Sequence, residues 1–99
     1  MAEPPDRIEV VRTGGFAGIP RRGSVDLATA PAHEREAALV ALDDLRRAAA
    51  RPADAGRPDA FTYTVAVSRG GRREELTLAE SAVPESARRL LDRTLDSPG

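Results

Sequence analysis

The side chains that could act as acids, bases or nucleophiles are few and scattered along the chain. His33 is the only histidine, and it lies among charged residues where we expect it to be exposed to solvent. The carboxylate pairs Asp43-Asp44 and Glu74-Glu75 are adjacent in sequence. Neighbouring residues point about 100° apart on a helix and to opposite faces of a strand, so neither pair converges on one substrate atom. The sequence therefore predicts no catalytic residue, and we interpret these carboxylates as solvated charges.

Metal and cofactor sites lack their usual ligands and motifs. The chain has no cysteine, and zinc sites are built mainly from cysteine and histidine. The glycine-rich stretch RTGGFAGIPRR, from Arg12 to Arg22, resembles a phosphate loop only superficially, because that motif requires a lysine and this chain has none. The dinucleotide fingerprint G-x-G-x-x-G is also missing. We therefore expect no metal and no cofactor.

The same stretch places Phe16 between three glycines, in a segment that looks like loop. Burying a phenylalanine contributes about 1.5–3 kcal/mol, so a phenylalanine left in water forfeits a large contribution to stability. Two interpretations stand side by side. Phe16 either folds back over one end of the domain's own core or is held out for a partner.

Composition argues against nucleic acid and membranes as partners. The net charge is −1, and the three aromatic residues are too few for a stacking surface on single strands. All 15 basic residues are arginine, which a genome rich in G and C explains without any binding patch. No apolar run is long enough to cross a membrane, and the N-terminus does not resemble a signal peptide. We expect a cytoplasmic protein that is a monomer when free.

Hydrophobic periodicity predicts six elements in the order ββαββα. Alternation indicates strands, and apolar residues at helical spacing indicate helices. Prolines 31 and 84 fit first helical positions, and Gly70-Gly71 is typical of a hairpin turn. We predict strands over residues 7–12, 21–27, 61–68 and 72–79, and helices over residues 31–50 and 84–95.

This order predicts an α+β fold, a four-stranded antiparallel sheet with one long helix and one short C-terminal helix packed on it. Residues 1–6 are expected to form a flexible tail, and residues 7–96 a single domain. In the long helix the apolar stripe is predicted to bury Leu39, Leu42 and Leu45, together with alanines 38, 41 and 49.

Three sequence blocks add a family resemblance to this physical reading. RIEVVRTGGFAG near the N-terminus, DAFTYTVAV in the middle and VPESARRLLD near the C-terminus resemble the emfourin family. Its members are small bacterial protein inhibitors of thermolysin-like zinc metallopeptidases of the protealysin type. The resemblance runs from about Arg7 to Leu95, and its most specific pieces are residues 12–18 and 59–65. It implies an intracellular inhibitor without enzymatic activity, a protealysin-like metallopeptidase as protein partner, and an α+β fold.

The resemblance does not assign contact residues, so we choose them on physical grounds. Thermolysin-like enzymes prefer a bulky apolar residue on the prime side of the cut, and a loop that offers Phe16 between small residues suits such a pocket. The hypothesis is a protease-binding loop of Arg12, Gly14, Gly15, Phe16, Ala17, Gly18, Ile19 and Arg21. Arg12, Arg21 and Arg22 are expected to meet acidic groups at the rim of the cleft. The alternative is a regulatory module that binds another partner through the same loop, and a small hydrolase that depends on His33 is a remote third possibility.

Overall fold

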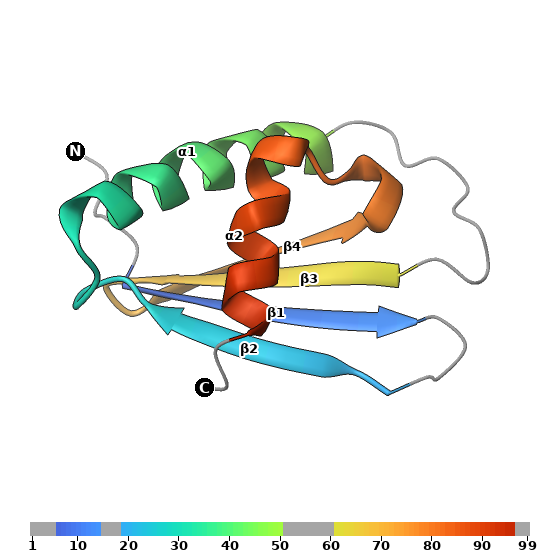
Figure 1. Ribbon diagram of the computed structural model, residues 1–99, viewed down its shortest axis with the longest axis horizontal. Helices are drawn as coiled ribbons and strands as arrows, with labels where there is room; N and C mark the ends of the chain where they lie inside the picture. Colours follow the sequence, from blue (N-terminus) through green and yellow to red (C-terminus); the bar gives the residue numbers. More distant parts are fainter. Residues whose placement is uncertain (1–5, 15–18, 51–60, 97–99) are drawn as a thin grey trace.

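The computed structural model describes residues 6–14, 19–50 and 61–96. It contains four strands, two α-helices and one 3₁₀ turn in the predicted order ββαββα (Figure 1). The elements are β1 (Arg7–Gly14), β2 (Arg21–Asp26), α1 (Ala32–Ala49), β3 (Phe61–Arg69), β4 (Arg72–Ala79), η1 (Glu80–Ala82) and α2 (Glu85–Leu95). The predicted bounds differ from these by at most two residues, and only η1 was not expected.

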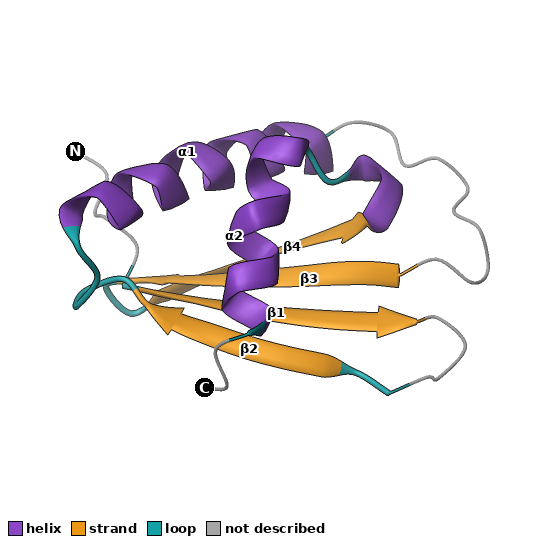
Figure 2. Ribbon diagram, viewed as in Figure 1, coloured by secondary structure: helices purple, strands orange, loops and turns teal. Residues whose placement is uncertain are grey.

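The four strands form one antiparallel sheet in the order β2-β1-β3-β4 (Figure 2). Gly70 and Gly71 close the β3–β4 hairpin with φ values of 49° and 86°, a region that glycine enters without strain. At the same end of the sheet Asp6 holds the start of β1. Its N–H donates to the carbonyl of Ser68, and its own carbonyl accepts from Leu27 and Ala28. The α+β architecture predicted from the sequence is thus confirmed.

Both helices cover one face of the sheet, and the core lies between the two layers. Ile8 and Val10 on β1 and Val65 and Val67 on β3 are fully buried there. These residues occupy alternate positions because successive side chains of a strand point to opposite faces. From α1 and α2 the buried partners are Ala38, Ala41, Leu42, Leu45, Ala87, Leu91 and Leu95.

The apolar stripe of α1 corrects one prediction. Leu39 was expected in the core, but its side chain is 40% exposed. The buried positions Ala38, Ala41, Leu42 and Leu45 follow the spacing i, i+3, i+4, i+7, and Leu39 is rotated about 100° from Ala38. Ala49 is only half-buried, at the last turn of the helix.

Both helices begin one residue later than predicted, so that each proline precedes the first helical residue instead of occupying it. Pro31 and Pro84 are the residues before the first helical residue, with extended ψ values of 153° and 146°. The carbonyl of Pro31 accepts from Glu34 and Arg35, and that of Pro84 from Ala87 and Arg88. A proline in this position has no N–H to leave unpaired, which is why it begins a helix at little cost.

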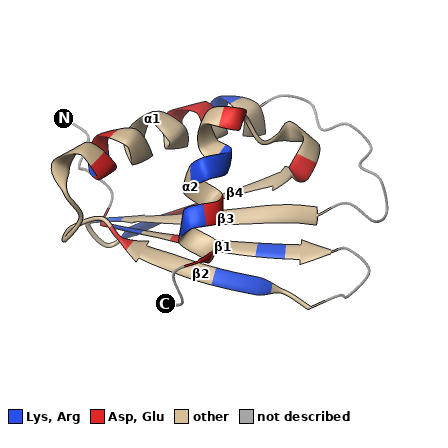
Figure 3. Cartoon of the chain, in the orientation of Figure 1, with Lys and Arg blue, Asp and Glu red and all other residues tan. Residues whose placement is uncertain are grey.

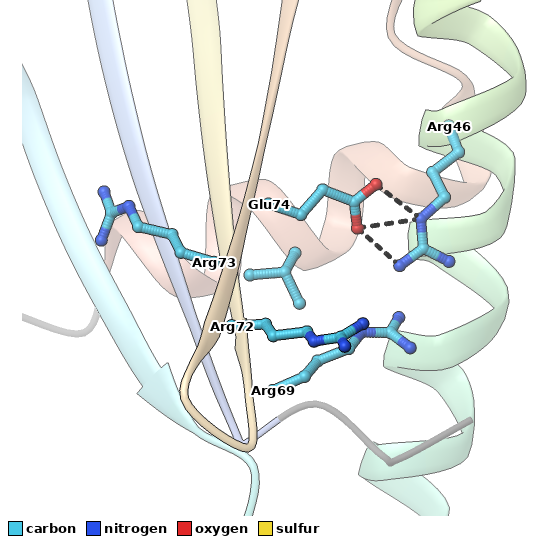
Figure 4. A pocket seen from close by; sticks show the side chains of 6 residues that line it. Arg46, Arg69, Arg72, Arg73 and Glu74 are labelled. Carbon is cyan, nitrogen blue, oxygen red and sulfur yellow. Dashed lines mark hydrogen bonds and ion pairs between the residues drawn. The ribbon is translucent and has the colours of Figure 1, made fainter. Parts of the chain in front are cut away.

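Charged residues occur along both helices, whereas β3 carries a single one, Arg69 (Figure 3). Arg46 of α1 reaches Glu74 of β4, with Nη2 2.8 Å from Oε1 and Nε 3.1 Å from both carboxylate oxygens (Figure 4). These hydrogen bonds lower the pKa of Glu74 below its ordinary 4.5, against the partial burial that raises it. This bidentate pair ties the long helix to the edge strand.

Helix α2 approaches β2 at Gly23, which is buried. A Cβ built at Gly23 would overlap the carbonyl oxygen of Thr94 and lie 2.7 Å from the Cα of Leu95. The last turn of α2 therefore rests directly on the strand backbone, and only glycine leaves room for it. Nearby, Arg21 Nη2 lies 2.8 Å from Asp96 Oδ1 at the end of the same helix.

We predict that Gly23→Ala destabilises the domain by about 1–3 kcal/mol, because backbone atoms of α2 must move to admit the new methyl group. Strand propensity alone favours alanine and predicts the opposite sign. Urea unfolding measures the difference, with Arg22→Ala as the matched control, an exposed residue on the other face of β2 where we expect a change below about 0.5 kcal/mol. An unchanged stability for Gly23→Ala would contradict the close approach.

The Arg46–Glu74 pair predicts a pH dependence of stability. Because the folded-state pKa of Glu74 is lowered, its contribution is complete above the unfolded pKa near 4.5 and is lost as the pH falls through the folded value. The wild type should exceed Glu74→Gln in unfolding free energy at about pH 6, by at most about 1 kcal/mol for so exposed a pair. The difference should shrink toward about pH 3, as measured by urea unfolding. A difference that grows on acidification would refute the assignment.

Candidate functional site

The connection between β1 and β2 leaves the sheet at Gly14. Gly14 has a φ of 98°, a backbone conformation that strains other residues, and Arg12 and Arg21 form the last β1–β2 pair before the connection. Gly15, Phe16, Ala17 and Gly18 lie outside the described residues. The orientation of the Phe16 ring therefore stays a prediction, and the described parts of the site are the residues on either side of it.

Those flanking residues are exposed. Thr13 and Gly14 precede the central segment, and Ile19 and Pro20 follow it, all with solvent-exposed surface. Ile19 is 77% exposed, more than Val40 at 62% or Leu39. A large aliphatic side chain in this environment contributes little to the domain's own core and is available for contact with another molecule.

Arg12 is placed differently from the rim position that we expected. Its guanidinium carbon lies 4.4 Å from the centre of the Phe61 ring, within cation–π distance, and Arg12 is half-buried. Gly14 and Phe61 are directly paired across β1 and β3. The stack therefore joins the end of β1 to the start of β3, so that residues 14 and 61, which flank two separate connections, share one end of the sheet.

The neighbouring arginines differ in their roles. Arg21 is engaged with Asp96, the residue that follows α2, although both side chains remain largely exposed. Arg22 is exposed and, within residues 6–14, 19–50 and 61–96, forms no ion pair. A rim contact was expected for Arg12, Arg21 and Arg22 alike, and among these three only Arg22 has a guanidinium without a partner in the described structure.

The remaining ionisable residues do not assemble into a reaction centre in the described part of the chain. His33 is exposed in the first turn of α1, as predicted. Both adjacent aspartates are neutralised within the chain: Asp43 and Asp44 pair with Arg47, at 2.7 and 4.0 Å, and Asp44 also accepts a hydrogen bond from the Ser86 hydroxyl at 2.6 Å. Glu75 pairs with Arg73, whose side chain extends from the opposite side of β4 to that of Glu74. Among the described residues no group of three or more histidines, aspartates or glutamates could hold a metal ion.

A basic recess of about 360 Å³ lies beside the β3–β4 hairpin, at the opposite end of the sheet from Gly14. Arg69 and Arg72 extend from the hairpin toward α1, beside the Arg46–Glu74 pair. Val67 forms the apolar wall of the recess. This recess was not predicted from the sequence, in which the arginines were attributed to composition. Arg46 and Arg72 are brought together only by the packing of α1 on β4.

We predict that Arg12 and Phe61 are energetically coupled. Cation–π pairs of this exposure contribute about 0.5–1 kcal/mol, so Arg12→Leu and Phe61→Leu should together destabilise the protein by that much less than the sum of the single changes. A double-mutant cycle by urea unfolding measures the coupling. Arg22→Leu combined with Phe61→Leu is the control, and we expect those two effects to add.

Comparison with known proteins gives a family match. Neither described helix is both long and apolar enough to cross a membrane. No curated protein and no solved structure matches the chain. Residues 10–95 match the Emfourin family, a span that includes all four strands in whole or in part, both helices and the connection after Gly14. Membership of this family implies a role as a metallopeptidase inhibitor with a protein partner. The chain belongs to the Emfourin family.

Proposed function

We propose that this protein inhibits a thermolysin- or protealysin-like zinc metallopeptidase in the cytoplasm, by placing the loop around Phe16 in the active-site cleft. It performs no catalysis of its own. The observation that carries the proposal is the family match over residues 10–95, because it implies the inhibitor role. The geometry at the Gly14 end of the sheet supports the choice of loop.

The loop suits occlusion of a cleft for three physical reasons. β1 ends at Gly14 with a positive φ, and Ile19 and Pro20, which precede β2, are exposed. Phe16 lies between small residues, so a partner can approach its ring and the adjacent backbone closely. Burial of that ring in an apolar pocket contributes about 1.5–3 kcal/mol to binding.

The described contacts refine the roles of the arginines in this proposal. Arg12 stacks on Phe61 and supports the base of the loop. Arg21 is held by Asp96, so Arg22 is the better candidate for a contact with an acidic group at the rim of the cleft. With a single histidine and no cysteine in the chain, removal of the peptidase's zinc by chelation is disfavoured, and blockage by steric occupation is the mechanism proposed.

A second candidate is a regulatory module that binds a partner other than a metallopeptidase through the same exposed residues. The exposed Ile19 suits either partner. The two candidates differ in one measurement, because only the first lowers the turnover of a purified protealysin-like peptidase when the inhibitor is added at micromolar concentration.

We predict that Phe16→Ala weakens inhibition at least about tenfold and leaves the thermal unfolding midpoint within a few degrees of the wild type. The inhibition constant is measured by titration of a protealysin-like peptidase with a peptide substrate. Val40→Ala is the matched control, since it also removes an exposed apolar side chain, but from α1.

The control should inhibit like the wild type. If Phe16→Ala unfolds many degrees earlier while inhibition per folded molecule is unchanged, Phe16 belongs to the core and the loop proposal is wrong. If the wild type neither inhibits nor binds such a peptidase, the inhibitor proposal itself fails.

A further inference from the structure

The sheet has one face that no described element covers. Both helices pack on the face that carries Ile8, Val10, Val65 and Val67. The alternate residues of every strand point the other way, to what we call the open face. The strand register places these residues in rows, such as Arg22-Val11-Thr64-Thr77, which runs across all four strands.

Charge divides the open face into two halves. The half near the β3–β4 hairpin carries Arg7, Glu9, Asp26, Arg73 and Glu75. The half near Gly14 consists of Val11, Thr13, Thr62, Thr64, Thr77 and Ala79, and we call it the uncharged half. Arg22 lies at its outer edge, opposite Val11 on the edge strand β2.

The charged half is satisfied within the chain. Arg7 Nε lies 3.4 Å from Glu9 Oε1, and Arg7 donates to the Ser24 hydroxyl at 3.1 Å. Arg73 pairs with Glu75 at 3.1 Å. A partner that covered these residues would have to remove water from ion pairs that are already formed, and would gain few new contacts in return. Charged residues of this kind are typical of the rim of a protein interface.

The uncharged half has the opposite character. Within the described residues the hydroxyls of Thr62, Thr64 and Thr77 form no hydrogen bond, so they are available to a partner. The surface is β-branched and partly apolar, and Thr13 and Thr77 are exposed while Val11, Thr62 and Thr64 are half-buried. Depletion of charge with retained hydrogen-bonding capacity is typical of the centre of a protein–protein interface.

We propose that the uncharged half of the open face is a second part of the surface that binds the metallopeptidase, continuous with the loop around Phe16. This inference rests on the proposed function. Thr13 belongs to the uncharged half and is followed directly by Gly14, where the loop begins. A single loop is too small for a stable complex, which buries about 800 Å² on each partner, and two rows across three strands add roughly 200 Å² of adjoining flat surface.

The same features define the partner surface. It is flat and uncharged at its centre, with hydrogen-bonding groups that meet the threonines, and it carries an acidic group opposite Arg22. A second copy of this chain is the competing occupant. If the uncharged halves of two copies met, Arg22 of each would face a surface without a carboxylate. We therefore propose the peptidase as the occupant.

The test introduces one carboxylate at matched positions. Thr64→Glu and Thr77→Glu place a charge in the uncharged half, and Ser68→Glu places it on the same strand as Thr64 but in the charged half, between Arg7 and Arg73. We expect the first two variants to raise the inhibition constant against the protealysin-like peptidase by about tenfold or more, because a partner would bury the charge. Ser68→Glu should change it by less than about threefold.

Circular dichroism and thermal unfolding establish that each variant is folded, and the exposed Thr77 supplies a second measurement if Thr64→Glu is unstable. If the wild type inhibits and Phe16→Ala weakens inhibition, but Thr64→Glu and Thr77→Glu behave like Ser68→Glu, this inference is wrong while the loop proposal stands. Sedimentation of the free proteins addresses the competing occupant. A wild-type dimer that Thr64→Glu dissociates would assign the open face to self-association and overturn the inference.

Discussion

The contact between the last turn of α2 and the backbone of β2 at Gly23 determines how the rest of the domain is arranged. It lets the short helix lie directly against the edge strand beside β1, while α1 packs toward β4 on the same face. The two helices thereby cover one layer of the sheet from edge to edge. One core results, and the other layer of side chains is left to solvent or to a partner. A bulkier residue at this position would lift α2 and open the core above Val10 and Leu91.

The fold could be predicted from local patterns because those patterns are strong where they matter. The alternation over Phe61–Ser68 and the turn at Gly70-Gly71 together determine the β3–β4 hairpin, and the two prolines mark both helix starts to within one residue. Leu39 was misplaced because a helical stripe is wider than the row of residues that contacts a sheet. Which edge of the stripe is buried depends on how the helix is rotated, and sequence periodicity does not specify that rotation.

The contacts that define the site were beyond reach for a different reason. Arg12 and Phe61, and likewise Arg21 and Asp96, are brought together across a long stretch of chain. Local sequence spacing does not predict such pairs, because the topology of the sheet brings the two residues together. The sequence did identify the connection after Gly14 as the segment of interest. It had no means of showing that the residues around it divide into supporting and exposed groups.

The central position of β1 also bears on how the protein is made. β1 precedes the other described strands in sequence, yet its neighbours in the sheet are β2 and β3, and the Asp6 N–H donates to the carbonyl of Ser68. Contacts of such long sequence separation are slow to form. The contact at Gly23 is also of this kind, because Thr94 and Leu95 of α2 pack on it. The core of the domain is therefore completed only after α2, which follows all four strands in sequence, has been synthesised.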